Sequence, residues 1–561
     1  MKFIGFLFWI LLPFACHAQK QGNQWRFGAQ AGLNFNSGQP VVVPGGQTGT
    51  NSGPGENQEG TSCISDSAGT LLFYANGKGI WNSNNQLMPN AMDLQGGLSS
   101  TQAALIVPKP GNDSLFYVFT SDQFQSYTSL PLKGYRYSIV NKCLDNKKGD
   151  VMPNAKNILL LDSATEKLSA CLDAAGTGYW VVGHKMFSDQ FHAWHLTAAG
   201  ITATVVSSVG MVHGLWPNSS PPSWFAGMAQ GQMKINPAGT RLGLVHGNYQ
   251  PALLDLFDFN SGTGVVSNPC QIVTDAPMLK SPYGLEFSPD GSKVYIALVG
   301  GSGGNRLHQY DLSVGACSAV GGSDVLIYQS AVSNPALYGM QLATDNRIYI
   351  VAGNNLASID LPNLVGTACN FNPMGVSSAT FNNSYTLPSF VAGFAYMNDL
   401  VACSPQNLNA GTSASVICAG EQATLVASGA TTYTWNTGAT SPSITVSPSA
   451  TTSYTVTGSG NGMIGVTTVV TQSVAPCTEM GSIKNDLFIS VFPNPSSGQV
   501  QIKCTEVIDL VEVTDLLGRL VYQESPGQAM HRLQINDPGV VVILISSGGR
   551  TFRQKLLIEK E

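Results

Sequence analysis

Short stretches of alternating hydrophobic and polar residues recur through the first four hundred positions of the chain. The clearest two are residues 283–296 and 338–350. Each predicts a strand, a tight turn at Gly291 or Asn346, and a second strand rich in β-branched and aromatic residues. Weaker copies of the unit precede them, with turns at Gly69, Gly111, Gly176 and Gly239. One repeated antiparallel unit therefore organises this part of the chain.

The six turn residues follow one another at intervals of 42, 65, 63, 52 and 55 residues. Short strands at such a period are typical of a β-propeller, in which each blade is a small antiparallel sheet. A seventh blade is expected from the two ends of the region, with residues 387–396 as one strand and residues 25–35 and 41–43 as the others. Joining the ends in one sheet removes an open edge, so we favour seven blades and keep six as the alternative.

The pattern changes at residue 401, where Ser, Thr, Ala and Val become frequent. Residues 423–427, 433–435, 443–446 and 453–457 alternate with period two at spacings that predict a β-sandwich. A further alternating segment, 487–561, predicts a second small sandwich after a polar linker at 478–486. The predicted fold class is all-β: a propeller (19–400), a sandwich (401–477) and a small sandwich at the C-terminus.

Composition supports this fold class and excludes others. Charged residues make up 11% of the 561 residues, against roughly 25% in an average chain, and there are 61 glycines. Low charge and abundant glycine suit turn-rich sheets and disfavour helical bundles. The net charge of −6 provides no basic footprint, so we expect no nucleic-acid partner.

The N-terminus has the features of an export signal. A lysine precedes the apolar run 3–14, and Ala-Cys-His-Ala then supplies the small residues that a signal peptidase requires, so residues 1–18 are predicted to be removed. Lipidation of Cys16 is the alternative. No later stretch approaches the ~20 apolar residues of a membrane span, so we expect no transmembrane segment.

Several motifs in the first region carry a family resemblance. They are Trp25-x-Phe27-Gly28, Glu59-Gly60, residues 71–74, Ser100-Thr101-Gln102, Glu166-Lys167-Leu168, residues 283–291 and residues 387–390. Over roughly residues 25–400 they resemble a group of secreted β-propeller proteins of Bacteroidota, with some likeness to propellers carrying YVTN or lactonase-type repeats. The resemblance implies a fold and a compartment but no ligand.

The second region resembles the immunoglobulin-like repeats of secreted Bacteroidota proteins, through Cys418-Ala419-Gly420, residues 427–430 and residues 433–435. Such repeats often carry a cysteine where this chain has Met463. The partner of Cys418 is therefore open between Cys403 and Cys477.

The last region carries four motifs in a fixed order: residues 491–498, 511–521, 538–544 and 555–558. Together they resemble the C-terminal sorting domain of the type IX secretion system. The resemblance implies recognition by the type IX secretion machinery, passage through the outer membrane, removal of the domain and attachment to the cell surface. The residues that carry the sorting motif are Pro493, Asn494, Pro495, Gly498, Asp515, Gly518, Arg519, Gly539 and Lys555.

Two apparent catalytic motifs lack the structural context that their chemistry requires. Residues 300–304 match G-x-S-x-G, but the segment lies between two predicted strands, whereas a nucleophile elbow leads into a helix. His192 and His195 are three apart in a predicted strand, so they point to opposite faces and do not share an ion. We expect no catalytic residue, metal or cofactor.

Two groups of residues are candidates for ligand binding. The first comprises polar residues near the first strand of each unit, which lines the channel of a propeller: Glu59, Gln102, Glu166, Glu286 and Gln341, with Lys234 beside them. The second is a Pro-rich insertion that carries Trp216, Trp224 and Phe225. The alternatives are a wet channel that tolerates polar groups and an aromatic loop that is simply buried.

Three Asp-Ser-apolar triplets resemble the short acceptor for O-glycans in Bacteroidota, which makes Ser67, Ser114 and Ser163 candidates for modification. The leading hypothesis for function is a secreted, surface-attached propeller that binds an extracellular glycan or protein. The rival is a propeller hydrolase, lyase or lactonase that uses channel carboxylates. Two carboxylates about 5–10 Å apart in an open pocket would favour the rival.

Overall fold

The computed structural model describes residues 20–28, 30–45, 59–123, 133–214, 228–247, 251–275, 281–300, 304–330, 336–378, 381, 385–397, 408–460, 463–476 and 488–559. Regular structure in these ranges is nearly all β-sheet. The α-helical segments are two short turns, α1 (Leu144–Lys147) and α2 (Cys317–Gly322). The predicted all-β fold class is confirmed.

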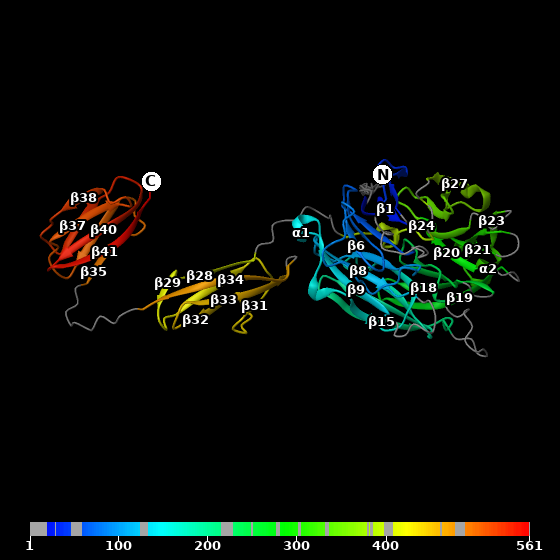
Figure 1. The fold of residues 1–561 in the computed structure, drawn as a ribbon, viewed down its shortest axis with the longest axis horizontal. Coiled ribbons are helices and arrows are strands. Elements are labelled where there is room, and N and C mark those ends of the chain that lie inside the picture. Colours follow the sequence, from blue (N-terminus) through cyan, green and yellow to red (C-terminus); the bar gives the residue numbers. More distant parts are fainter. Residues whose placement is uncertain are drawn as a thin grey trace, which may run out of the picture. The chain divides into compact units, whose positions relative to one another are not determined.

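The described part of residues 20–397 forms seven sheets, taken up in chain order with antiparallel neighbours (Figure 1). The first two sheets are β1 (Gln24–Phe27), β2 (Ala31–Asn34) and β3 (Val41–Val42), then β4 (Ser62–Ser65), β5 (Leu71–Ala75) and β6 (Ile80–Asn82). The third sheet has β7 (Ala104–Pro108), β8 (Leu115–Ser121) and β9 (Tyr135–Asn141), with β10 (Asp150–Val151) and β11 (Ile158–Leu161) both paired to β9.

The other four sheets have four strands each. They are β12 (Ala164–Leu172), β13 (Tyr179–Lys185), β14 (Gln190–Thr197) and β15 (Gly200–Ser208); β16 (Met233–Ile235), β17 (Arg241–Val245), β18 (Ala252–Asn260) and β19 (Val265–Asp275); β20 (Ser281–Phe287), β21 (Lys293–Val299), β22 (Arg306–Asp311) and β23 (Val325–Gln329); β24 (Leu337–Leu342), β25 (Ile348–Ala352), β26 (Asn355–Ile359) and β27 (Phe371–Ser377). Seven such sheets in sequence are the blades of a β-propeller.

The ring closes by packing of its first blade against its last. The rings of Trp25 and Phe35 in the first blade lie 5.9 and 5.6 Å from the ring of Tyr349 in the last. First strands of neighbouring blades, such as β12, β16, β20 and β24, contact one another around the centre. The first strand of each blade is therefore the innermost one.

One detail of the predicted closure is wrong. Residues 387–396 do not form a strand beside β1; instead an isolated parallel bridge joins Ser389 to Ser62 on β4. Ser389 donates from its amide to Thr61 at 2.7 Å and accepts from the Ser62 hydroxyl at 2.7 Å. A 3₁₀ turn at Ala392–Phe394, with Gly393 at φ +63°, bends the chain before a ladder can form.

Residues 408–476 fold into two facing sheets around Trp435, Leu425 and Val456. The first has β28 (Asn409–Thr412), β30 (Ala423–Ser428) and β32 (Ser443–Val446), and the second has β29 (Val416–Cys418), β34 (Met463–Ala475), β33 (Thr452–Gly460) and β31 (Thr432–Trp435). Alternating burial along β30 and β31 matches the period-two pattern of the sequence. Cys418 is disulfide-bonded, and its two candidate partners, Cys403 and Cys477, lie outside the described residues.

Residues from 475 onward form a separate compact unit. Its sheets are β35 (Ile489–Phe492), β36 (Gln499–Cys504) and β39 (Met530–Gln534), and β38 (Leu520–Glu524), β37 (Leu510–Asp515), β40 (Gly539–Ser547) and β41 (Arg550–Ile558). The core between them is almost wholly aliphatic, with Ile502, Val513, Ile543 and Ile545 fully buried. This unit has its own core, as an independently folding module requires.

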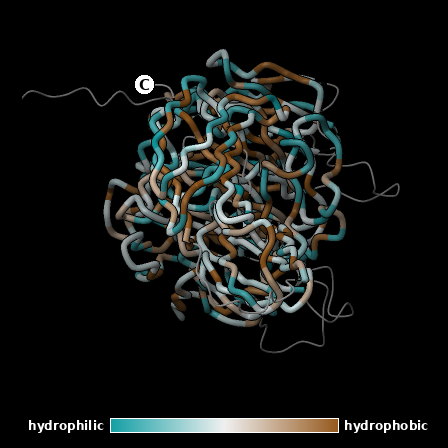
Figure 2. Tube along the Cα trace, turned by 90° about the vertical axis from the view of Figure 1, so that its left-hand side faces the viewer, coloured by the Kyte–Doolittle hydropathy of each residue, from teal (hydrophilic) through white to brown (hydrophobic). Residues whose placement is uncertain are grey.

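Hydrophobic and hydrophilic residues interleave along the strands in Figure 2, as period-two alternation requires. Within the ranges described above, no helix is long and apolar enough to cross a membrane. A disulfide joins Cys270 on β19 to Cys317 in α2, and Cys143 is disulfide-bonded as well. Cys63, Cys171, Cys369 and Cys504 are buried free thiols.

Candidate functional site

The polar residues predicted to line the channel are all buried at the centre of the propeller. Glu59, Gln102, Glu166, Glu286 and Gln341 are each less than 9% exposed, and Lys234 is 7% exposed. They lie on, or just before, the innermost strands of their blades. These residues therefore lie near the inner strands, as their sequence positions indicated. Their hydrogen-bond partners show whether they are available to a ligand.

Gln102 joins three blades by itself. Its side-chain nitrogen donates to the carbonyls of Leu168 at 2.8 Å and Met233 at 3.0 Å. Its side-chain oxygen accepts from the backbone amides of the same two residues. Gln232 makes similar bonds two blades further around the ring: its amide oxygen accepts from the Leu285 and Met340 backbone amides at 3.1 and 2.8 Å, and its amide nitrogen donates to the Met340 carbonyl at 3.1 Å. The sequence analysis missed Gln232, although it occupies the same position as Gln102, one or two residues before an inner strand.

Most charged side chains of the channel also form hydrogen bonds or ion pairs within the protein. The Glu166 carboxylate accepts from both the amide and the hydroxyl of Thr101 at 2.9 Å. Lys234 lies 2.9 Å from the Glu286 carboxylate and donates to Gln341 at 2.6 Å. Because such buried groups would be costly without partners, these bonds hold neighbouring blades together.

Glu59 is different from the other channel carboxylates. One of its carboxyl oxygens, Oε2, has no hydrogen-bond partner among the described residues. Burial raises the pKa of Glu59 to about 8, the nearby Glu166 carboxylate raises it further, and the Tyr283 hydroxyl opposes the rise. Glu59 is therefore largely protonated at neutral pH, which is the state that a buried carboxyl without a counter-ion adopts.

A second buried cluster, absent from the sequence predictions, lies between the fourth and fifth blades. The rings of His184 and His213 stack with centroids 3.7 Å apart, and His246 meets His213 edge-on at 4.6 Å. His246 Nε2 lies 2.8 Å from an oxygen of Asp255. Burial lowers the pKa of His184 and of His213 well below the usual value, with further lowering from neighbouring basic groups.

Lys167 completes this cluster and anchors a connection. Its ammonium donates to the carbonyls of Met228, Ala229 and Gln230 at 3.2, 3.1 and 2.5 Å. Burial lowers the pKa of Lys167 to about 7. No group of His, Cys, Asp and Glu side chains in the described ranges has an arrangement that could hold a metal ion. The lowered pKa values keep His184 and His213 neutral, and no sequence periodicity marks the cluster because its members come from separate strands and connections.

The aromatic candidates Trp216, Trp224 and Phe225 lie outside the described residues. Hydrogen bonds hold both described ends of their connection. The Phe187 amide donates to the His213 carbonyl at 2.8 Å, and the Gly214 amide donates to the sulfur of Met228 at 3.5 Å. These three residues stay predictions.

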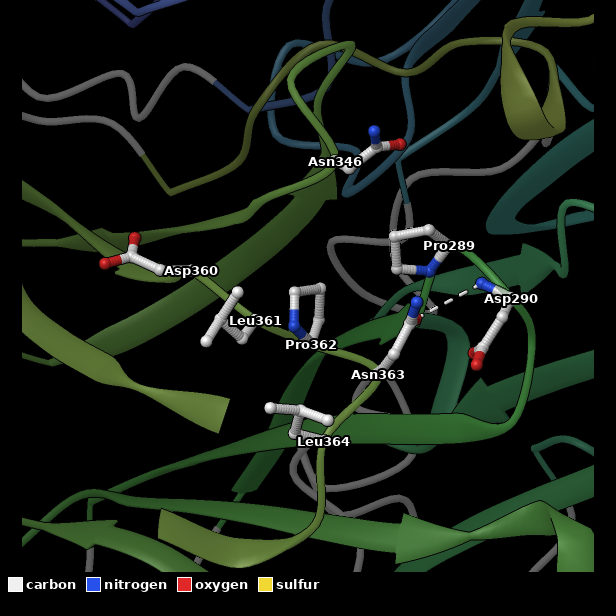
Figure 3. Close-up of a pocket in the computed structure, with 8 residues that line it drawn as sticks. All are labelled: Pro289, Asp290, Asn346, Asp360, Leu361, Pro362, Asn363 and Leu364. Atoms are coloured by element: carbon white, nitrogen blue, oxygen red, sulfur yellow. Dashed lines mark hydrogen bonds between the residues drawn. The ribbon is translucent and has the colours of Figure 1, made fainter. Parts of the chain in front are cut away.

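Two open pockets lie on the opposite side of the propeller from the starts of the inner strands. One, of about 560 Å³, is lined by Pro289, Asp290, Asn346, Asp360, Leu361, Pro362, Asn363 and Leu364 (Figure 3). The other, of about 550 Å³, includes Lys20, Phe35, Asp345 and Phe394 and shares Pro289 and Asn346 with the first. The turns β20–β21, β24–β25 and β26–β27 leave the same ends of their antiparallel blades, which brings these residues together. We call the two pockets the rim groove.

One wall of the rim groove is the connection from β26 to β27, residues 361–365, which we call the 361–365 loop. Figure 3 shows Leu361, Pro362 and Leu364 along this wall and the bond from the Asp290 amide to Asn363, which measures 3.3 Å. The sequence analysis did not single out this loop, because a short Leu-Pro-Asn-Leu-Val connection carries no periodic or catalytic signal.

The three serine candidates for O-glycans differ in exposure. Ser67 lies exposed in the turn between β4 and β5. Ser114 is 9% exposed, and its hydroxyl bonds to Asn112 at 3.0 Å. Ser163 is half-buried, with its hydroxyl 3.5 Å from the Met186 carbonyl. Access therefore favours Ser67.

The sorting-motif residues lie where they fix the entry, the turns and the end of the C-terminal unit. Asn494 bonds to the Lys555 carbonyl and the Leu557 amide, both at 2.9 Å, which ties the first strand to the last. Asp515 accepts from the Arg519 amide at 2.9 Å and from its side chain at 2.6 Å, around Gly518 at φ +81°. Positive φ favours glycine at this turn position, and Gly498 and Gly539 meet the same requirement at φ +110° and +139°. Pro493 and Pro495 flank Asn494 just after β35.

Comparison with known proteins identifies this last unit. Residues 490–559 match the family of secretion system C-terminal sorting domains, which covers nearly all of β35 to β41. The chain therefore carries a type IX sorting domain, is exported across the outer membrane, and belongs to a class of exported proteins typically attached to the cell surface. The sorting domain implies interaction with the type IX secretion machinery.

The rest of the chain has distant likenesses. Hydrazine synthase of Kuenenia stuttgartiensis is 12% identical at a TM-score of 0.33, over 56% of this chain and 79% of that one. PorZ, a surface component of the type IX system of Porphyromonas gingivalis, is 10% identical at 0.22, over 95% and 81%. The periplasmic gluconolactonase of Pseudomonas aeruginosa is 9% identical at 0.29, over 75% and 100%. Comparison with curated proteins gives no match. At these TM-scores the likenesses imply nothing about activity.

Proposed function

We propose that this chain is a cell-surface binding protein whose propeller recognises an extracellular ligand at the rim groove. The observation that carries the proposal is the contrast between centre and rim. Four of the five predicted channel residues, Gln102, Glu166, Glu286 and Gln341, are bonded within the protein, whereas the rim groove is open and lined mostly by exposed side chains. A site for an external partner needs accessible groups, and within the described residues the groove supplies them.

The proposed organisation follows the chain. A signal peptide (1–18) is removed, the propeller (19–400) binds, and an immunoglobulin-like sandwich (401–477) serves as a spacer. The linker (478–486) is the site where the sorting domain (487–561) is cut away. The signal peptide and the linker lie outside the described residues.

Binding is tested with the full chain on arrays of glycans, extracellular proteins and peptides. The expected result is saturable capture of one ligand class that a variant of the rim groove loses. Leu364→Ser is the informative variant, and Leu159→Ser on β11 is its control, since the two leucines are 46% and 50% exposed. Equal binding by the wild type and both variants would remove the groove from the proposal.

A second candidate function is hydrolysis through the channel, and one observation favours it. A carboxyl whose pKa is raised to about 8, such as that of Glu59, beside a second carboxyl, that of Glu166, has the pairing that acid–base catalysis uses. Glycan or lactone turnover that Glu59→Gln abolishes without unfolding the chain would establish this function. We favour binding, because Glu59 and Glu166 are 8% and 1% exposed, which leaves little of either side chain accessible to a substrate.

The export route has its own test. Deletion of residues 487–561 is expected to leave a folded propeller in the periplasm, because the deleted unit has a core of its own. Fractionation of cells that carry the full and the shortened chain measures this, and sequencing of the mature C-terminus locates the cut. Normal surface amounts of the shortened chain would contradict the role of the sorting domain.

Modification is proposed at Ser67, the exposed serine of the three candidates. Mass spectrometry of the native protein is expected to show a glycan on Ser67 and a bare Ser114. A glycan on Ser114 but not on Ser67 would show that access does not govern the choice.

A further inference from the structure

The 361–365 loop exposes aliphatic side chains and is nevertheless held firmly. Leu361, Leu364 and Val365 are 51%, 46% and 56% exposed. Apolar side chains gathered on a surface cost free energy in water unless something covers them. A loop that serves only as a connection would have no need of them.

Two buried residues of the sixth blade fix this loop of the seventh. Gln309 on β22 donates to the Leu364 carbonyl at 2.7 Å and accepts from the Gly366 amide at 2.8 Å. Tyr295 on β21 donates its hydroxyl proton to the Pro362 carbonyl at 2.8 Å and accepts from Gln309 at 2.6 Å. The exposed side chains are therefore presented in one arrangement before any ligand arrives, which lowers the entropy cost of binding.

The groove beside the loop is acidic as well as apolar. Asp290 and Asp360 line its first pocket, and no Lys or Arg is among the lining residues of that pocket. The Asp360 carboxylate already has partners: it lies 3.6 Å from Arg347 and accepts from Ser358 and Asn370 at 2.8 and 3.0 Å. Asp290 is exposed, and bonds from Ser288 and Ser292 with the charge of Lys293 outweigh burial and lower its pKa. An incoming cation thus meets the Asp290 carboxylate next to exposed leucines.

We propose that the rim groove binds an extended peptide segment of a partner protein that carries an aliphatic side chain beside a lysine or arginine. The proposal rests on the binding function above and names its ligand class. The aliphatic side chain packs on Leu361 and Leu364, the cation faces Asp290, and the exposed amide of Asn346 meets the peptide backbone. A glycan fits less well, because the aromatic rings in the groove, Phe35 and Phe394, are 2% and 7% exposed and offer no stacking face.

The test is a positional-scanning peptide library presented to the full chain. We expect enrichment of an aliphatic residue next to Lys or Arg. For the best enriched peptide, Leu364→Ser weakens binding at least tenfold, or about 1.4 kcal/mol, while the Leu159→Ser control does not. Asp290→Asn weakens binding several-fold and flattens its salt dependence, since screening acts on charge pairs.

A positioning variant separates contact from pre-organisation. Tyr295→Phe removes the hydroxyl that holds Pro362 but leaves the exposed surface unchanged. It is expected to weaken peptide binding a few-fold and to speed hydrogen exchange at the Gly366 amide, whereas a merely structural role would leave binding unchanged.

The outcomes distinguish this inference from the proposed function. Capture of glycans and no peptides, lost in Leu364→Ser, would overturn the peptide assignment and keep the binding function. Enriched peptides without a basic residue would overturn the role of Asp290. Capture of no ligand of any class by the wild type would overturn both.

Discussion

The centre and the rim of the propeller use side chains in opposite ways. At the centre, the side-chain amides of Gln102 and Gln232 bond to backbone groups of neighbouring blades. At the rim, buried Gln309 also bonds to backbone, but there it fixes a loop whose apolar side chains face water. Polar residues that resemble a binding site thus stabilise the ring, while the proposed recognition surface is apolar and is only supported by polar bonds.

The largest effect is expected at the centre. Gln102→Leu leaves two backbone amides and two carbonyls of Leu168 and Met233 without their partner. At about 1–3 kcal/mol per unsatisfied group, the free energy of unfolding falls by about 4 kcal/mol or more, a large part of the 5–15 kcal/mol of an ordinary domain. Denaturant unfolding measures this loss.

Gln271→Leu on β19 is the control, because Gln271 is exposed. Its free energy of unfolding is expected to stay within about 0.5 kcal/mol of the wild type. A Gln102→Leu variant as stable as this control would show that the blades do not depend on the central bonds.

Glu59 makes the stability of the centre depend on pH. The folded protein keeps this proton up to about pH 8, whereas the unfolded chain releases it near pH 4.5. The folded state therefore binds more protons in this window, so the contribution of Glu59 to stability falls as pH rises through it. Melting temperatures of Glu59→Gln relative to wild type should rise steadily from pH 5 to pH 8. A constant difference would mean that Glu59 is ionised in the folded protein.

The histidine cluster is expected to act in the opposite direction. His184 and His213 stay neutral in the folded state, so the unfolded chain takes up more protons as pH falls below about 6.5 and stability is lost there. No hydrogen bond of good geometry reaches either ring nitrogen of His184 within the described residues, although the Lys185 backbone lies beside it. His184→Leu should be neutral or stabilising by about 1 kcal/mol at pH 7 and should lessen the acid sensitivity.

A loss of stability in His184→Leu would contradict this prediction. A loss of more than about 1 kcal/mol at pH 7 would show that the imidazole has a polar partner, such as a bound water, that the variant strands. The comparison of urea unfolding at pH 5 and pH 7 for both proteins decides between the two.

The smallest effect on stability is expected at the rim. Leu364→Ser removes an apolar side chain that is already 46% exposed and leaves the carbonyl that Gln309 binds in place. Its free energy of unfolding should match that of the wild type within about 0.5 kcal/mol. A loss comparable to that of Gln102→Leu would place Leu364 in the structure of the ring rather than on a recognition surface.

The sequence predicted the blades well because period-two alternation and glycine turns such as Gly239 and Gly291 are local signals. It placed Glu59 and Glu166 near the centre for the same reason. It could not reveal their partners: Gln102 bonds to Met233, 131 residues away, and no local pattern encodes such a contact. The strand predicted for residues 387–396 failed because the turn at Gly393 and the packing of Phe390 on Trp25 prevail over local alternation.

The rim groove escaped sequence analysis for a related reason. Its residues come from turns of several blades and from segments far apart in the sequence, such as Phe35 and Phe394. Tyr295 and Gln309 resemble ordinary strand residues until their bonds to the 361–365 loop are seen. The sorting domain, in contrast, was predicted from four contiguous motifs, and the family match at residues 490–559 confirms it.

The most direct measurement compares the affinity of wild type, Glu59→Gln and the double variant Leu361→Ser with Leu364→Ser for the ligand captured by the full chain. The account predicts that Glu59→Gln binds as the wild type does, while the double variant binds at least tenfold more weakly at unchanged stability. Loss of binding in Glu59→Gln, with full affinity in the double variant, would place the site in the channel and contradict the account.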